Sequence, residues 1–255
     1  MVKYTYCITF IIGKKKEKVV KMFFNTKKYA EEVEKDHKHD LQEEPSMFNM
    51  ISLGLMATFA PTRIFLKLHK RHIQNKANIE KSDLKQVPII YFHGFRGGDY
   101  TTRVMVKHAT HDKGNPKFLK ETVDLLGNFK LEGTWTSDKH PIVQVAFRQR
   151  IVGIYGIDYY LNFVLPFLAK RYGFKNYIAV AHSLACPCII RTEMKHYRSK
   201  TFPHLKKCAF IAGPFAGVTY LGDIPNVNYL TESGRPRVMN PHYLYLFFNR
   251  RKFNP

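Results

Sequence analysis

Hydrophobic and polar positions divide the chain into two unlike parts. From residue 88 onward, short and almost wholly apolar runs alternate with longer amphipathic stretches. Such runs are typical of strands buried in a parallel sheet, and the amphipathic stretches are typical of the helices that cover it. This part therefore predicts an α/β domain with a mostly parallel sheet, helices on both faces and one hairpin insertion. The predicted strands are 87–92, 121–126, 129–135, 141–147, 176–181 and 206–212, and the predicted helices are 99–110, 155–171 and 184–198.

The part before residue 88 is patterned differently. Residues 1–44 predict a small β-hairpin followed by a charged helix with Asn25 as its N-cap. Residues 45–72 predict an apolar helix, because residues 45–62 contain no charged side chain. A stretch of that length is at the lower limit for crossing a bilayer, so the helix either anchors the chain in a membrane or packs on the domain. Residues 73–87 are polar and predict a linker to a domain at residues 88–255.

The charge balance is strongly basic. Lys and Arg number 41 against 20 acidic residues, which gives a formal net charge of +21. This excess predicts attraction to anionic surfaces, either through a scattered, solvated set of lysines or through a specific anion site. The scatter of the charges favours the first explanation, and no specific binding of nucleic acid is expected. Four cysteines in 255 residues do not form a disulfide framework, so the redox compartment stays open.

A serine stands where the predicted strand 176–181 meets the next predicted helix. The stretch "AHSLA" places Ser183 between two small residues, Ala181 and Ala185, and resembles the G-x-S-x-G turn that presents a nucleophile between a strand and a helix. Pro187 fits the first turn of a helix that starts near residue 184. The alternative is a buried serine at the end of a strand that caps the following helix.

A second stretch favours the nucleophile over the cap. Residues 88–98, "PIIYFHGFRGG", are an apolar strand that ends in His-Gly and a glycine-rich loop. In α/β hydrolases this loop supplies one N–H group of the oxyanion hole. By position, the two donors here are the N–H groups of Phe95 and Leu184, and His93 is a structural residue of the loop. A phosphate-binding loop is less favoured, because neither a Walker A lysine nor G-x-G-x-x-G is present.

With these motifs in place, residues 88–239 resemble a bacterial family of α/β hydrolases of unknown function, often labelled cell-surface hydrolases. The matching segments are "IYFHGFRGG", "PIVQVAF", "LAKRYGFKNYIAVAHSLA", "HLKKCAFIAGPFAG" and "ESGRPRVMNP". The resemblance implies a serine hydrolase with a small-molecule or lipid-like acyl substrate, at a membrane or the cell surface, with a cytoplasmic location as the alternative. No cofactor and no metal are expected. The family usually has glycine where Ala181 and Ala185 stand, which makes the turn less typical.

The remaining members of a catalytic triad are harder to place. The order of this fold requires an acid and a histidine after the serine. Asp223 and His242 have this order, but they lie in residues 213–243, where no predicted strand positions them. We therefore expect a hydrolase fold that is incomplete at its C-terminus, with Ser183 present and catalysis impaired. The alternative is a catalytically silent scaffold that binds an anionic surface or a partner through its basic face.

Overall fold

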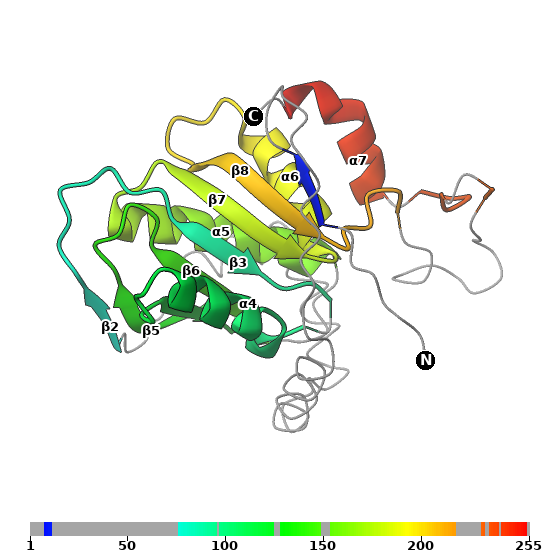
Figure 1. Ribbon diagram of the computed structural model, residues 1–255. Coiled ribbons are helices and arrows are strands. Elements are labelled where there is room, and N and C mark those ends of the chain that lie inside the picture. The colour runs from blue at the N-terminus through cyan, green and yellow to red at the C-terminus, as the bar shows by residue number, and fades with distance from the viewer. Residues whose placement is uncertain are drawn as a thin grey trace, which may run out of the picture.

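A computed structural model describes residues 8–11, 76–95, 97–124, 128–148, 154–217, 231–232, 235–239 and 241–253. These residues form a single sheet covered by helices (Figure 1). The strands are β1 (Ile8–Ile11), β2 (Lys76–Ile79), β3 (Ile89–Phe92), β4 (Leu119–Val123), β5 (Phe129–Trp135), β6 (Ile142–Phe147), β7 (Asn176–His182) and β8 (His204–Ile211). The helices are α4 (Asp99–Asp112), α5 (Ile154–Tyr172), α6 (Ala185–His196), α7 (Pro241–Asn249) and the short 3₁₀ helix η2 (Arg250–Lys252).

The sheet is mostly parallel, as the apolar runs predict. Its strand order is β1-β8-β7-β3-β6-β4-β5-β2. Strands β8, β7, β3, β6 and β4 run parallel to one another, and β2 runs parallel to β5. The antiparallel pairs are β4 with β5, which is the predicted hairpin insertion, and β1 with β8. The predicted α/β-hydrolase-like sheet is therefore present.

The core lies on both faces of the sheet because successive side chains of a strand point to opposite sides. On one face, Ile90 and Phe92 of β3 are fully buried in the main cluster, which includes most of the apolar residues of α5 and α6. On the other face, Tyr91 packs with Val106 of α4 and Ile142 of β6. Figure 1 shows α4 on the near side of the sheet and α5 and α6 behind it.

Two strands of the sheet lie in segments before residue 88. Residues 73–87, expected to be a linker, contain β2, which pairs with β5 at one edge of the sheet. Its sequence "KANI" lacks an apolar run because an edge strand has a neighbour on one side only and its side chains are largely exposed. Within residues 1–44, expected to be a separate extension, β1 joins the other edge of the sheet and pairs with β8.

The membrane hypothesis for residues 45–72 lies outside the described residues. Within the described part of the chain, no helix combines the length and the apolar character needed to cross a bilayer.

The order of the strands brings the two sequence motifs together. Strands β3 and β7 are parallel neighbours, with Phe92 opposite Ala181. Because parallel neighbours end at the same edge of a sheet, the glycine loop after β3 and the serine after β7 emerge side by side.

Candidate active site

Ser183 lies in a sharp turn between β7 and α6. Strand β7 ends at His182 and α6 begins at Ala185, so only Ser183 and Leu184 connect them. Ser183 has φ of 53°, a left-handed conformation that costs a non-glycine residue on the order of 1–3 kcal/mol. Its N–H donates to the Ile211 carbonyl of β8 at 2.9 Å, and its carbonyl accepts from the Cys186 N–H at 3.0 Å. Backbone hydrogen bonds on both sides therefore hold the positive φ of Ser183.

The residues around the turn are small and tightly buried. Ala181 is 1% exposed and Ala185 is fully buried, which fits the requirement for small side chains where the strand and the helix meet. The Cys186 thiol donates to the Ala181 carbonyl at 3.3 Å across the turn. Pro187 is the third residue of α6, within the first turn, as the sequence predicts.

The glycine loop after β3 packs directly against this turn. A Cβ added to Gly94 would lie 2.7 Å from the Cβ of Ser183, 2.8 Å from the His182 carbonyl oxygen and 3.0 Å from the Leu184 nitrogen. These distances are shorter than real Cβ atoms allow, so only glycine fits at this position without a shift of the backbone. The loop and the serine thus form one site, although they are 89 positions apart in the sequence.

Two backbone N–H groups near Ser183 have no acceptor among the described residues. They belong to Phe95, in the glycine loop, and to Leu184, which directly follows Ser183. Buried backbone donors are nearly always paired in folded proteins, and donors left unpaired at a catalytic turn are available to a ligand oxygen. Leu184 as a whole residue is 1% exposed, so its N–H at the turn is a buried donor.

The structure describes only one of the two candidate triad partners. Asp223 lies outside the described residues. His242 is at the start of α7 and only 1% of it is exposed. Burial, and then the positive charge of Arg191, lowers the pKa of His242 to about 3, against a weaker opposing effect from Asp158. Among the described residues, no hydrogen bond joins the Ser183 hydroxyl to a histidine.

His242 instead belongs to a charged cluster between α5, α6 and α7. The Asp158 carboxylate of α5 accepts hydrogen bonds from Arg191 at 2.5 Å and Lys195 at 2.6 Å, both of α6. The His242 ring makes a hydrogen bond with the Pro187 backbone and is influenced by these three charges. A base poised for catalysis needs both contact with the nucleophile and a pKa near the working pH, and the pKa of His242 is far below that range.

Sequence reasoning missed one strained residue beside the turn. Ala212, directly after β8, has φ of 49°. It follows Ile211, whose carbonyl accepts the hydrogen bond from the Ser183 N–H. Alanine rarely adopts this conformation, so the sequence contains no signal for it.

The sheet, the strained serine after β7 and the glycine loop after β3 define the class of α/β hydrolases. Within this class, the chain belongs to the family described as alpha/beta hydrolase of unknown function (DUF915), whose sequence profile matches residues 76–255. The match covers well over half of the chain and begins at β2. The resemblance read from the sequence motifs is thereby confirmed.

Two solved structures are similar to the chain. One is the product of the gene lin2722 of Listeria innocua, with 26% identity, a TM-score of 0.56, and coverage of 67% of this chain and 66% of that one. The other is a candidate cell surface hydrolase of Lactobacillus plantarum, with 18% identity, a TM-score of 0.53, and coverage of 67% and 64%. The chain thus spans slightly less than two thirds of each of these proteins. No curated protein matches it.

Proposed function

We propose that the chain is a serine hydrolase with Ser183 as its nucleophile and an ester-like or other acyl substrate, either a small molecule or lipid-like. The observation that carries the proposal is the positive φ of Ser183 at the strand–helix turn, with Gly94 in van der Waals contact with that turn. Strain of this kind persists where it serves a site, because the surrounding structure must compensate for it. Membership of the α/β-hydrolase family supports the same chemistry.

In this proposal, Ser183 Oγ forms a bond to the carbonyl carbon while the carbonyl electron pair moves onto its oxygen. The N–H groups of Phe95 and Leu184, which have no described protein acceptor, stabilise that oxyanion. The carbon–oxygen bond to the leaving alcohol then breaks, the alcohol takes up the proton released by the serine, and water later hydrolyses the acyl-enzyme. Acylation needs a group that moves the serine proton to the leaving alcohol, and deacylation needs a group that moves a proton from the attacking water back to Ser183 Oγ.

We propose that turnover is low because no described group is placed to take that proton. His242 makes no hydrogen bond with Ser183, and burial keeps its ring neutral within the α5–α6–α7 cluster. A hydrolase without a working triad member retains only roughly 10³- to 10⁴-fold catalysis from its oxyanion hole and binding. Hydrolysis of p-nitrophenyl esters should therefore be slow, and Ser183→Ala should change it little.

A fluorophosphonate probe tests the proposal separately from turnover. At high concentration and over hours, the probe should attach to Ser183 in the full chain, as peptide mass spectrometry would show. Ser183→Ala should abolish the adduct, whereas Ser199→Ala, which removes a half-buried serine in the segment after α6, should leave it. Failure of the wild-type chain to react would contradict a nucleophilic Ser183. Rapid ester hydrolysis lost in both Ser183→Ala and His242→Ala would instead make His242 the base.

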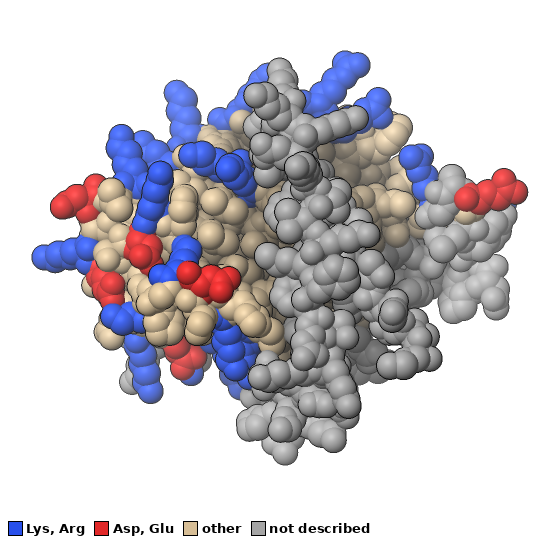
Figure 2. Space-filling view, in the orientation of Figure 1, with Lys and Arg blue, Asp and Glu red and all other residues tan. Residues whose placement is uncertain are grey.

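A second candidate function is a silent scaffold that binds an anionic surface. The observation that favours it is the basic surface: Figure 2 shows Lys and Arg spread over the visible face and outnumbering the acidic residues. We propose the membrane or the cell surface as the location on this basis and because one structural neighbour is named a candidate cell surface hydrolase. Salt-sensitive binding to anionic liposomes, with no reaction at Ser183, would support the scaffold over the enzyme.

A further inference from the structure

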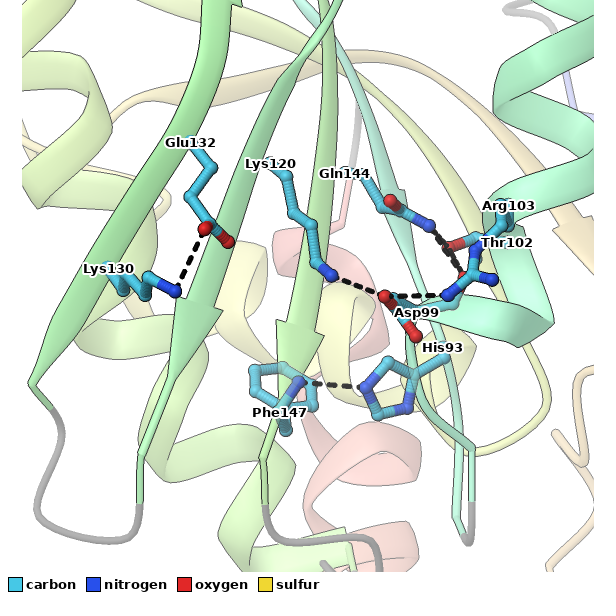
Figure 3. A network of polar contacts seen from close by, with 9 residues as sticks. All are labelled: His93, Asp99, Thr102, Arg103, Lys120, Lys130, Glu132, Gln144 and Phe147. Atoms are coloured by element: carbon cyan, nitrogen blue, oxygen red, sulfur yellow. Dashed lines mark hydrogen bonds and ion pairs between the residues drawn. The ribbon is translucent and has the colours of Figure 1, made fainter. Parts of the chain in front are cut away.

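The histidine before the glycine loop makes two hydrogen bonds that fix its protonation. His93 follows β3 and is 1% exposed. Its Nε2 accepts from the N–H of Phe147, the last residue of β6, at 2.9 Å (Figure 3). Because a ring nitrogen that accepts carries no proton, the proton of the neutral ring is on Nδ1. The Nδ1–H therefore donates to the Gly94 carbonyl, 2.9 Å away.

The Gly94 carbonyl is held by a second donor, the N–H of Gly97, at 3.2 Å. The peptide bond between Gly94 and Phe95 is trans and planar, so its carbonyl and its N–H point in opposite directions. Two donors that hold the carbonyl on one side therefore direct the Phe95 N–H to the other side. Gly94 itself contacts the Ser183 turn, so the orientation of this peptide is set at the site.

Packing keeps the His93 ring in place. A Cβ on Gly97 would lie 2.9 Å from the His93 Nδ1, so the glycine allows the loop to close directly over the ring. On another side, the ring of Phe147 meets His93 edge to face, with centroids 5.0 Å apart. The imidazole thus links the glycine loop to β6, a strand 54 positions away.

We infer that His93 is a positioning residue that sets the direction of the Phe95 N–H and so assembles half of the oxyanion site. The inference rests on the proposed function of Ser183 and Phe95, and it adds a residue that touches neither the substrate nor the nucleophile. It also accounts for a histidine that is fully buried beside the site and yet makes no hydrogen bond to Ser183 among the described contacts.

Two substitutions separate the two hydrogen bonds. In His93→Asn, the side-chain amide nitrogen takes the place of Nδ1 and keeps a donor for the Gly94 carbonyl, but the acceptor for Phe147 is lost. In His93→Gln, the side-chain oxygen takes the place of Nε2 and keeps the acceptor for Phe147, but the donor to Gly94 is lost. Each substitution removes one hydrogen bond and the imidazole ring. If His93 had a purely structural role, the two variants would therefore lose similar stability and label at similar rates.

The readout is the rate of fluorophosphonate labelling at Ser183, compared with the urea midpoint of each variant. We expect His93→Gln to label at least about tenfold more slowly than His93→Asn at similar stability, within the roughly 10²- to 10³-fold effect of removing an oxyanion donor. Gln86→Leu serves as a control, because Gln86 bonds to Thr136 and Trp135, away from the turn. It should lower the urea midpoint and leave the labelling rate unchanged.

The outcomes separate the two proposals. Equal labelling by both His93 variants, or slowing that merely follows their urea midpoints, would overturn the positioning role while Ser183 remains the nucleophile. No labelling of the wild-type chain would overturn the proposed function itself. Separately from labelling, ¹⁵N NMR of His93 tests the hydrogen bonds that orient the Phe95 peptide: we expect a protonated Nδ1 and an unprotonated Nε2, and the reverse pattern would overturn the positioning role.

Discussion

The strained backbone of Ser183 and the missing side chain of Gly94 belong to one tightly packed contact. The left-handed φ of Ser183 costs on the order of 1–3 kcal/mol, and its backbone hydrogen bonds to Ile211 and Cys186 offset that cost. The turn is also close enough to Gly94 that a single methyl group would fill the space between them. At the scale of single residues, the site is therefore sensitive to small changes in volume.

Gly94→Ala should disrupt the site more than the fold. The added Cβ would lie 2.7 Å from the Ser183 Cβ and 2.8 Å from a backbone oxygen, so the turn or the loop must shift. We expect a loss of roughly 1–3 kcal/mol in the free energy of unfolding, as for other overpacked sites. Fluorophosphonate labelling of Ser183 should be lost or strongly slowed, as measured by mass spectrometry.

Gly114→Ala is the matched control for that substitution. Gly114 has φ of 65° but nothing within 4 Å of an added Cβ. It should lose about 1 kcal/mol through the left-handed backbone alone and keep the labelling rate of the wild type. Equal labelling of the Gly94 and Gly114 variants would show that the close contact is irrelevant to the serine.

His242 predicts a pH dependence of stability. Its pKa in the folded chain is about 3, whereas the ordinary value is 6.5, because burial and the charge of Arg191 disfavour the protonated ring. Between these values the unfolded chain binds the extra proton and the folded chain does not, so stability falls as the pH drops below about 6.5. Lys195 adds to the effect and Asp158 opposes it.

His242→Gln, which keeps a neutral polar side chain, should remove that part of the acid sensitivity. Urea unfolding should be measured at several pH values between 6 and 4, which lie between the folded and ordinary pKa values of His242. Over this interval, the free energy of unfolding of the wild type should fall by up to roughly 1.4 kcal/mol more per pH unit than that of the variant. Parallel pH profiles for the two chains would contradict a buried neutral histidine. Labelling of Ser183 should be the same in both.

At the scale of elements, the amount that could be predicted depends on burial. Strands buried on both faces, such as β3 and β6, have apolar runs in the sequence. For these strands the predicted ends lie within two residues of the observed ends. Strand β2 was not predicted, because its side chains are mostly exposed and only its pairing with β5 makes it a strand. In the same way, Ser183 and Gly94 have sequence signals, whereas the role of His93 depends on Phe147, a long-range partner that no local pattern indicates.

The segment between β2 and β3 should behave as structure and not as a linker. The Gln86 side chain donates to the carbonyls of Thr136 and Asp138 and accepts from the Trp135 indole N–H at 2.7 Å. Gln86→Leu leaves that buried indole donor unpaired, so we expect a loss of about 2–3 kcal/mol in urea unfolding. The neighbouring exposed Lys85→Leu should change stability by less than about 0.5 kcal/mol. If both variants lost less than about 0.5 kcal/mol, the segment would be a linker and not part of the packed structure.

Helix α7 has one buried and one exposed apolar face. His242 and Tyr243 are buried against α6, whereas Phe247 is 50% exposed and Phe248 is 75% exposed. Exposed neighbouring aromatics promote association. The double variant Phe247→Ser/Phe248→Ser should therefore lower self-association in light scattering at a fixed protein concentration. Leu84→Ser, at another exposed apolar residue, should not. A wild-type chain that stays monomeric across the concentration range would contradict this prediction.

At the scale of the whole molecule, the described ion pairs leave much of the positive charge unbalanced. Some carboxylates are already occupied by two cations each: Asp99 pairs with Lys120 and Arg103 (Figure 3), and Asp158 pairs with Arg191 and Lys195. The net charge of +21 therefore acts mainly through solvated Lys and Arg. In Figure 2 these side chains are distributed around the visible face and not gathered in one place. Such a distribution favours attraction over the whole surface.

The full chain should therefore bind vesicles that contain anionic lipid more strongly than vesicles of zwitterionic lipid, in a co-sedimentation assay. Binding should weaken steeply with salt, because the screening length falls from about 10 Å at 0.1 M to about 3 Å at 1 M. Ser183→Ala should bind like the wild type. Equal binding to both kinds of vesicle, unaffected by salt, would indicate apolar insertion instead of charge attraction.

Paired charge reversals decide whether this attraction is diffuse or comes from one site. The exposed pair Lys206 and Lys207 lies on β8, and the exposed pair Arg250 and Arg251 lies in η2. If the whole surface contributes, replacing either pair with Glu should weaken vesicle binding to a similar degree, since each basic residue near an anionic bilayer contributes about 1 kcal/mol. If one pair abolishes binding and the other has no effect, the attraction is confined to a local site, and the scattered-charge interpretation is wrong.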